Sequence, residues 1–210
     1  WDIAVDNASG ACWISDGGFN GLYHIDTEGV VSEVKAALEQ PGDLAIDSAA
    51  GLGWVADRRR NEVFWFSTAS RRIVEFRSLP RPTSVEADAD GTAWVLVRDG
   101  AGLVRLGLDG EALEVDLPFS DAQSLAVNRR DGSVWVIGEG AIVHLGRSGE
   151  RIAQWEDVPV GRAIAVDWDR GRTWVATVST LWKFNEAGET MARLEGFSAM
   201  TRLSMDRGQR

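Results

Sequence analysis

A repeat of about 40 residues runs through the chain and restricts its fold more than any other feature of the sequence. A tryptophan followed by an apolar residue recurs once in each repeat, at nearly equal intervals: Trp13-Ile14, Trp54-Val55, Trp94-Val95, Trp135-Val136 and Trp174-Val175. A short, mostly apolar segment ending in Asp or Asn precedes each tryptophan, at 2–6, 43–47, 84–88, 124–128 and 163–167, and a sixth copy lies at 202–206. Such a period is typical of proteins built from stacked structural units.

Each repeat contains the pattern of four short strands, here called A to D. In the second repeat they span 43–47, 53–57, 63–67 and 72–77, with Gly51 in the first turn and Pro80 and Pro82 before the next repeat. In strand C the first, second and fourth positions are apolar, whereas the third varies: His24, Trp65, Arg105, His144 and Lys183. Apolar side chains on both faces indicate a sheet that is sandwiched between two neighbouring sheets.

The pattern predicts an all-β fold, a β-propeller of five tandem four-stranded blades plus one strand of a further blade in a six-bladed ring. The predicted blades span 2–42, 43–83, 84–123, 124–162 and 163–201, and the extra strand spans 202–206. The five tryptophans are expected to pack between blades. The segment 31–40 also has helical spacing, at Val31, Val34, Ala37 and Leu38. We expect strand D there, with an irregular end.

The two ends of the sequence supply only strand A of the sixth blade. We therefore expect the chain to be part of a larger propeller that lacks about 30 residues here. The alternative is a five-bladed ring that closes on itself. An open ring would expose an apolar blade face and the edge of the last strand, and such surfaces favour self-association.

Two repeats resemble a known family more specifically. The run from Trp54-Val-Ala-Asp57 through Asn61 to Phe66 resembles the core of an NHL-type repeat, and Asp16 and Asn20 occupy the same places in the first repeat. The later repeats carry Val97, Gly138 and Thr177 instead of the Asp. The resemblance implies a broad six-bladed superfamily with strictosidine-synthase-like, gluconolactonase-like and virginiamycin-B-lyase-like members. The family resemblance, and no other feature of the sequence, favours a secreted or periplasmic location.

The charge balance bears on partners. The chain has 32 acidic and 22 basic residues and a formal net charge of −10, which argues against binding to nucleic acid or to an anionic membrane surface. No apolar run approaches the ~18 residues that cross a bilayer. The one cysteine, Cys12, is interpreted as a small buried residue and leaves the redox compartment undecided.

The sequence contains no recognisable catalytic or metal-binding constellation. His24 and His144 occupy equivalent positions in repeats one and four, on opposite sides of a six-bladed ring, so they cannot share a site. The repeated aspartates could suggest a metal ring, but each lies at an A-to-B hairpin, where Asp caps the turn: Asp6, Asp47, Asp88, Asp167 and Asp206. We expect no catalytic residue, metal site or cofactor in this chain.

The candidate binding residues lie in the B-to-C and D-to-A loops, which would line one mouth of the central channel. They are Asp16, Asn20, Asp57, Arg58, Asn61, Arg98, Glu139, Arg162 and Arg202. The run Arg58-Arg59-Arg60 is either a solvated loop or an anchor for an acidic partner. The expected function is a non-catalytic binding or scaffold propeller that presents these loops to a protein or small molecule. The alternative is a lyase or lactone hydrolase of the virginiamycin-B-lyase-like or gluconolactonase-like type, with its decisive residues outside this chain.

Overall fold

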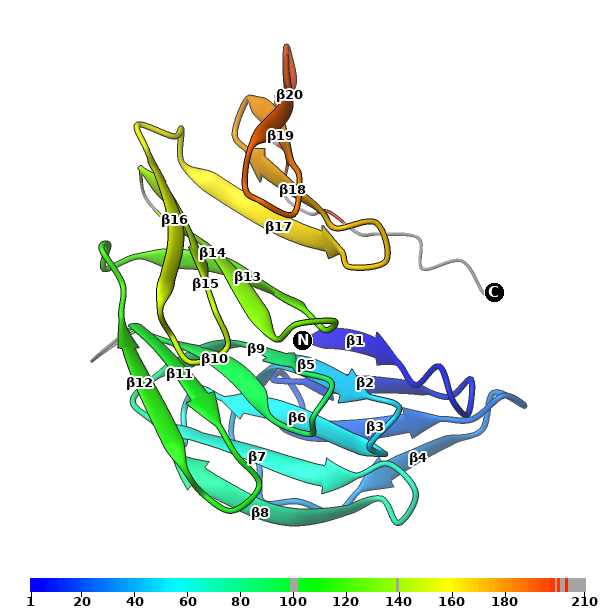
Figure 1. Cartoon of the computed structure of the whole chain (residues 1–210). Coiled ribbons are helices and arrows are strands. Elements are labelled where there is room, and N and C mark those ends of the chain that lie inside the picture. The colour runs from blue at the N-terminus through cyan, green and yellow to red at the C-terminus, as the bar shows by residue number, and fades with distance from the viewer. Residues whose placement is uncertain (99–101, 139, 199, 201–202, 204–210) are drawn as a thin grey trace. The chain divides into compact units, whose positions relative to one another are not determined.

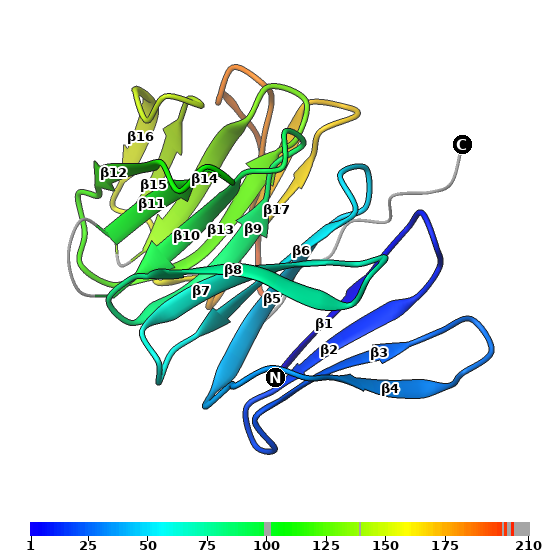
Figure 2. The same cartoon turned by 90° about the horizontal axis from the view of Figure 1, so that it is seen from below.

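The chain folds into strands only. The computed structural model describes residues 1–98, 102–138, 140–198, 200 and 203, and these form twenty strands and no helix (Figure 1, Figure 2). The strands make five antiparallel sheets of four, and each sheet is built from four consecutive strands. The predicted number of five four-stranded sheets is thereby confirmed. Of the extra strand at 202–206 the structure describes only Leu203, so that strand stays a prediction.

The chain divides into two compact units, which are described separately. The first unit, Trp1–Glu114, holds blades one to three. Its strands are β1 (Asp2–Val5), β2 (Cys12–Asp16), β3 (Gly21–Ile25) and β4 (Val31–Val34) in blade one, β5 (Pro41–Asp47), β6 (Leu52–Asp57), β7 (Glu62–Ser67) and β8 (Arg72–Ser78) in blade two, and β9 (Pro82–Ala87), β10 (Ala93–Val97), β11 (Gly102–Leu106) and β12 (Ala112–Asp116) in blade three.

The second unit, Val115–Arg210, holds blades four and five. Its strands are β13 (Ala122–Asn128), β14 (Ser133–Gly138), β15 (Ala141–Leu145) and β16 (Arg151–Glu156) in blade four, and β17 (Gly161–Asp167), β18 (Arg172–Thr177), β19 (Thr180–Phe184) and β20 (Thr190–Glu195) in blade five.

The segment with helical spacing forms a strand, as the repeat predicts. β4 covers Val31–Val34 and pairs with β3, and the chain is irregular from Lys35 to Leu38. Pro82 corrects the predicted start of strand A in blade three, because it is the first residue of β9 rather than a break before it. Strand A of blade two likewise starts earlier than predicted, at Pro41. A proline is tolerated at the first residue of a strand because its missing N–H breaks little of the ladder.

The core of the first unit lies between its blades. Trp13 of blade one packs on blade two, where its ring centroid is 4.6 Å from that of Phe66. Trp54 of blade two packs in the same way with Val85 and Val95 of blade three. Both indoles are fully buried, so the predicted role of these tryptophans in packing between blades is confirmed.

The second unit repeats this arrangement once. Trp135 of blade four packs on Ile164, Val175 and Phe184 of blade five. Trp174 of blade five differs from the other four strand B tryptophans, because it is only half-buried. The prediction that all five are mostly buried is therefore wrong for Trp174. Its side chain lies on the face of blade five that points away from blade four, and the structure describes no further blade there.

Candidate binding surface on the B-to-C loops

The B-to-C and D-to-A loops meet at the same end of each blade, because antiparallel strands bring the end of B next to the start of A. A backbone hydrogen bond joins the two loops in three blades. The N–H of Arg58 donates to the carbonyl of Gln40 (3.2 Å), Arg98 donates to Arg81 (3.1 Å), and Val178 donates to Val160 (3.2 Å). The predicted grouping of these loops at one end is thus built into the backbone of the blades.

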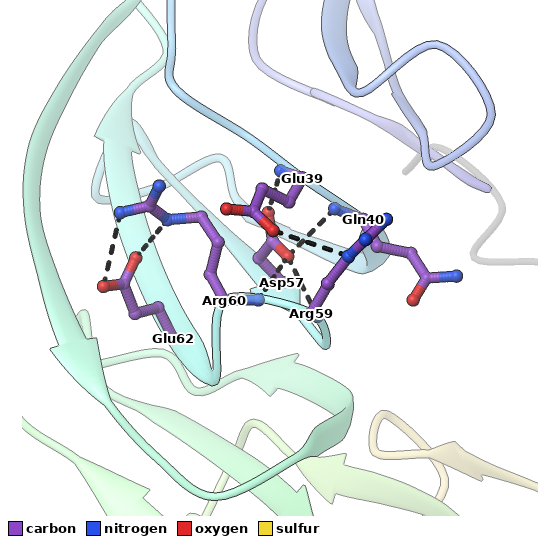
Figure 3. A network of polar contacts seen from close by, with 6 residues as sticks. All are labelled: Glu39, Gln40, Asp57, Arg59, Arg60 and Glu62. Carbon is purple, nitrogen blue, oxygen red and sulfur yellow. Dashed lines mark hydrogen bonds and ion pairs between the residues drawn. The ribbon is translucent and has the colours of Figure 1, made fainter.

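Asp57 is the anchor of this junction in blade two (Figure 3). Its carboxylate is fully buried and accepts four backbone hydrogen bonds. Two come from the D-to-A loop, from the N–H groups of Glu39 (2.8 Å) and Gln40 (3.0 Å). Two come from its own loop, from Arg59 (3.2 Å) and Arg60 (3.1 Å). The buried charge is therefore satisfied by the backbone, and its effect is to fix the shape of both loops.

Asn61 ties the same loop to the D-to-A loop that leads into blade three. Its backbone adopts a left-handed conformation, with φ of 56°, and its side-chain Oδ1 accepts a hydrogen bond from the N–H of Arg81 (3.0 Å). Its carbonyl accepts another from Leu79 (2.8 Å). In blade four, Gly140 occupies this place with φ of 76° and accepts the equivalent bond from Val158 (3.2 Å). In blades two and four this position has a positive φ, which explains the Asn and the Gly found there.

Asp16 and Asn20 form the corresponding loop in blade one. Asp16 Oδ1 accepts hydrogen bonds from the N–H groups of Gly18 (2.8 Å) and Phe19 (3.2 Å). Asn20 has φ of 55°. In the amide orientation that satisfies both partners, its nitrogen donates to the carbonyls of Gly17 and Glu39. The NHL-like Asp and Asn thus bond mainly to the backbone in both blades.

The arginines of the same loops point outward. Arg59 pairs with Glu39 at 3.6 Å, and Arg60 pairs with Glu62 at 2.6 Å (Figure 3). Arg58 is exposed, and its guanidinium makes no hydrogen bond or ion pair with any residue that the structure describes. Arg81 and Arg98 are exposed on the adjoining loops. Half of the basic residues of Trp1–Glu114 therefore lie in these loops.

The remaining predicted site residues lie in the second unit or outside the described residues. Arg162 is exposed in β17 and belongs to the second unit. Glu139 and Arg202 lie outside the described residues.

The two histidines are partners of tryptophan rings. His24 lies across from Trp13 in the sheet with ring centroids 4.9 Å apart, and His144 stacks on Trp135 at 4.1 Å. Both are buried, and burial lowers the pKa of each, that of His144 to about 4. The His144 imidazole is therefore neutral at pH 7. The third position of strand C provides such a partner in every blade, since Trp65, Arg105 and Lys183 lie across from and against Trp54, Trp94 and Trp174.

The repeated aspartates that the structure describes cap turns, as expected for A-to-B hairpins, whereas Asp206 lies outside the described residues. Asp6 Oδ1 accepts from the N–H of Ala8 (3.1 Å), Asp47 Oδ1 from Ala49 (3.1 Å), and Asp88 Oδ1 from Ala89 (2.7 Å). Among the described residues, no group of three or more His, Cys, Asp or Glu side chains is arranged to hold a metal ion. The same residues include no helix that could span a membrane.

A pair of carboxyl groups at the start of strand A was not predicted from the sequence. Asp2 Oδ2 accepts the N–H of Leu44 (3.2 Å) from the next blade, and Asp43 Oδ2 accepts Val85 N–H (2.8 Å) and the Ser84 hydroxyl (2.6 Å) from the blade after. Burial, with the negative charge of Asp2 nearby, raises the pKa of Asp43 to about 6. The sequence signal that could have predicted this pair is the Asp at the first position of the strand A segment in repeats one and two.

Comparison with known proteins defines the class of fold. No family model and no curated protein matches this chain. Virginiamycin B lyase from Staphylococcus aureus is similar in structure, with a TM-score of 0.78 and 20% identity over 92% of this chain and 68% of that one. A streptogramin B lyase has a TM-score of 0.79 and 15% identity over 94% of this chain and 70% of that one. Kuenenia stuttgartiensis hydrazine synthase has a TM-score of 0.74 and 13% identity over 90% of this chain and 64% of that one.

At these identities the likeness concerns the fold alone, and it confirms that the chain has a β-propeller fold. The expected resemblance to virginiamycin-B-lyase-like propellers is confirmed at this level. The NHL repeat and a ring of six blades remain predictions.

Proposed function

We propose that the chain is a non-catalytic binding or scaffold propeller that presents the B-to-C and D-to-A loops of blades two and three to a protein partner rich in carboxylates. The observation that carries the proposal is the Asp57 junction. Four backbone N–H groups converge on one buried carboxylate and hold both loops in place. A surface whose backbone is fixed in advance loses little entropy on binding.

The charge of the same loops supports an acidic partner. Arg58, Arg81 and Arg98 project from loops that are tied to one another by backbone hydrogen bonds, within a chain of net charge −10. Guanidinium groups bind carboxylates through charge-assisted and often bidentate hydrogen bonds. An excess of acidic residues elsewhere on the chain disfavours longer polyanions such as nucleic acids.

The test is binding of a fluorescein-labelled hexaglutamate peptide at low salt, measured by fluorescence anisotropy. We expect Arg58→Glu to weaken binding by about tenfold, because it replaces an attractive charge with a repulsive one. Arg72→Glu is the matched control, since Arg72 is an exposed arginine of the same blade at the start of β8. We expect it to change the affinity by less than about twofold. Equal losses in both variants, or no binding by the native chain, would contradict the proposal.

The lyase alternative draws on the fold likeness. One of the similar structures is a catalytically inactive histidine variant of virginiamycin B lyase with quinupristin. In this chain both histidines are buried against tryptophan rings in strand C, away from the loops. We therefore expect no turnover of quinupristin by the purified chain in a chromatographic assay. Turnover that persists in the double variant His24→Gln/His144→Gln would assign the activity to other residues and favour the alternative.

A further inference from the structure

A short stretch of backbone, residues 39–44, connects the arginine loops of blade two with the start of β5. At its first end, the N–H groups of Glu39 and Gln40 donate to the Asp57 carboxylate (Figure 3). The Gln40 carbonyl accepts the N–H of Arg58. The position of this stretch, here called the linking segment, therefore affects the shape of the loop that carries Arg58.

Side chains of blade one hold the linking segment where the sheet does not. The pairing of β5 with β6 is irregular between Pro41 and Leu44. In this interval the Ser15 hydroxyl donates to the carbonyl of Gly42, and the Leu44 N–H donates to Asp2 Oδ2 (3.2 Å). A change in the charge or position of Asp2 therefore reaches the linking segment directly.

Asp43 belongs to the linking segment and faces Asp2. Its Oδ2 atom accepts the Ser84 hydroxyl (2.6 Å) and the Val85 N–H (2.8 Å), and its carboxyl group also forms a hydrogen bond with that of Asp2. Two carboxyl groups share such a bond only when one of them carries a proton. Burial, with the negative charge of Asp2, raises the pKa of Asp43 to about 6, so this proton is gained or lost close to neutral pH.

The other charged groups on the strands that pack against β5 are engaged elsewhere. These strands are β1, β2, β6 and β9. Asp16 of β2 accepts two backbone N–H groups of its own loop, and Asp57 of β6 accepts four. Glu86 of β9 lies on the face that is turned away from blade two. Asp2 of β1 is therefore the charged group that acts on Asp43.

We propose that Asp2 and Asp43 form a proton switch that regulates the binding of an acidic partner by the arginine loops. With one proton on the pair, the two carboxyl groups bond to each other and the linking segment is held. With both ionised, they repel each other, the linking segment loosens, and the loop that carries Arg58 loses its fixed shape. This proposal rests on the proposed function of these loops and adds its regulation.

Linkage gives the direction of the effect. The held state binds the proton more tightly than the loosened state, because the held state keeps the two carboxyl groups together. The affinity for an acidic partner should therefore be highest below about pH 6 and fall above it. Blade three lacks this control. Ser84 stands in the place of Asp43, and Val97 stands in the place of Asp57, and neither side chain titrates.

The first test is binding of fluorescein-labelled hexaglutamate by the full chain at about pH 5 and about pH 7.5, on either side of the Asp43 pKa. Asp43→Asn keeps the hydrogen bonds of the protonated carboxyl group and carries no charge. We expect the native chain to bind about fivefold more weakly than this variant at the higher pH and equally at the lower one. Titration of the peptide itself cancels in this ratio. Asp109→Asn removes the same charge from an exposed turn and should behave as the native chain does at both pH values.

The second test needs no ligand. Hydrogen exchange is measured for the native chain and Asp43→Asn at the same two pH values, and circular dichroism shows that the variant is folded. The amides of Gln40 and Leu44 should exchange faster in the native chain at the higher pH and equally at the lower one. The amide of Arg81, which donates to Asn61, is the internal control and should exchange equally in both chains.

The outcomes separate this proposal from the one on which it rests. Binding that depends on Arg58, with the same ratio of native to Asp43→Asn affinity at both pH values, would overturn the switch alone. Equal exchange of Gln40 and Leu44 in the two chains at the higher pH would also overturn it. Equal losses in Arg58→Glu and Arg72→Glu would overturn the proposed function, and the regulation with it, even where the exchange rates differ.

Discussion

At the scale of single residues, the side chains that suggested binding from the sequence act first on the backbone. Asp57 and Asn61 hold the loops of blade two against the neighbouring segments, and the exposed Arg58 is carried by this support. The positions of the two loop residues could be predicted from the repeat. Their hydrogen-bond partners could not be predicted, because periodicity indicates which face of the sheet a residue occupies but not which distant N–H group donates to it.

Removal of the Asp57 carboxylate should be costly. Asp57→Ala leaves four N–H groups without their acceptor, and we expect a loss of about 3 kcal/mol in the free energy of unfolding. Asp57→Asn keeps one acceptor oxygen and should lose less. Asp16→Ala is the control, with an expected loss of about 1 kcal/mol, because it removes two bonds of a more exposed turn. Urea unfolding measures all three, and equal effects of Asp57→Ala and Asp16→Ala would refute the anchoring role.

Asp43 should make stability depend on pH. The pKa of its carboxyl group is raised in the folded chain, so the folded state binds the proton more tightly than the unfolded state. Its contribution to stability is fully present below about pH 4 and is lost as the pH rises to about 6 and above. The charged or hydroxyl groups facing it are Asp2 from β1 and Ser84 from β9.

We expect the native chain to lose about 1–2 kcal/mol relative to Asp43→Asn between about pH 4 and pH 7, after allowance for partial exposure. The measurement is urea unfolding of both proteins at a series of pH values. Asp2→Asn should reduce the effect because it removes the nearby negative charge. A difference that is constant with pH would show that Asp43 does not titrate in this range.

At the scale of the elements, most of the fold could be predicted. The Trp spacing and the alternation within each strand place all twenty described strands, including β4, where local spacing favoured a helix. Two burial predictions are wrong, because Cys12 and Trp174 are both only partly buried. The case of Trp174 has a structural reason. A column of equivalent residues predicts equal burial only when each blade has a following neighbour, and the structure describes none beyond blade five.

The tryptophan column provides a comparison within one protein. Trp135→Ala should cost about 3–5 kcal/mol, since it empties a fully packed site between blades four and five. Trp174→Ala should cost less than about half of this, because its side chain is already half-exposed. Unfolding in urea, followed by tryptophan fluorescence and circular dichroism, measures both. Equal losses would show that the Trp174 side chain is packed as tightly in solution as that of Trp135, and would contradict its half-buried position.

At the scale of the whole molecule, each of the five sheets is complete within a single repeat of the sequence. No strand pairs with a strand from another repeat among the described residues. Chains dominated by such short-range pairing form their contacts early, since little loop-closure entropy opposes them. During synthesis, the first sheet can therefore assemble once its four strands have left the exit tunnel, without waiting for later repeats. When Asp57 leaves the exit tunnel, the Glu39 and Gln40 amides that it captures have already emerged, so blade two can lock onto the loop that follows blade one in the order of translation.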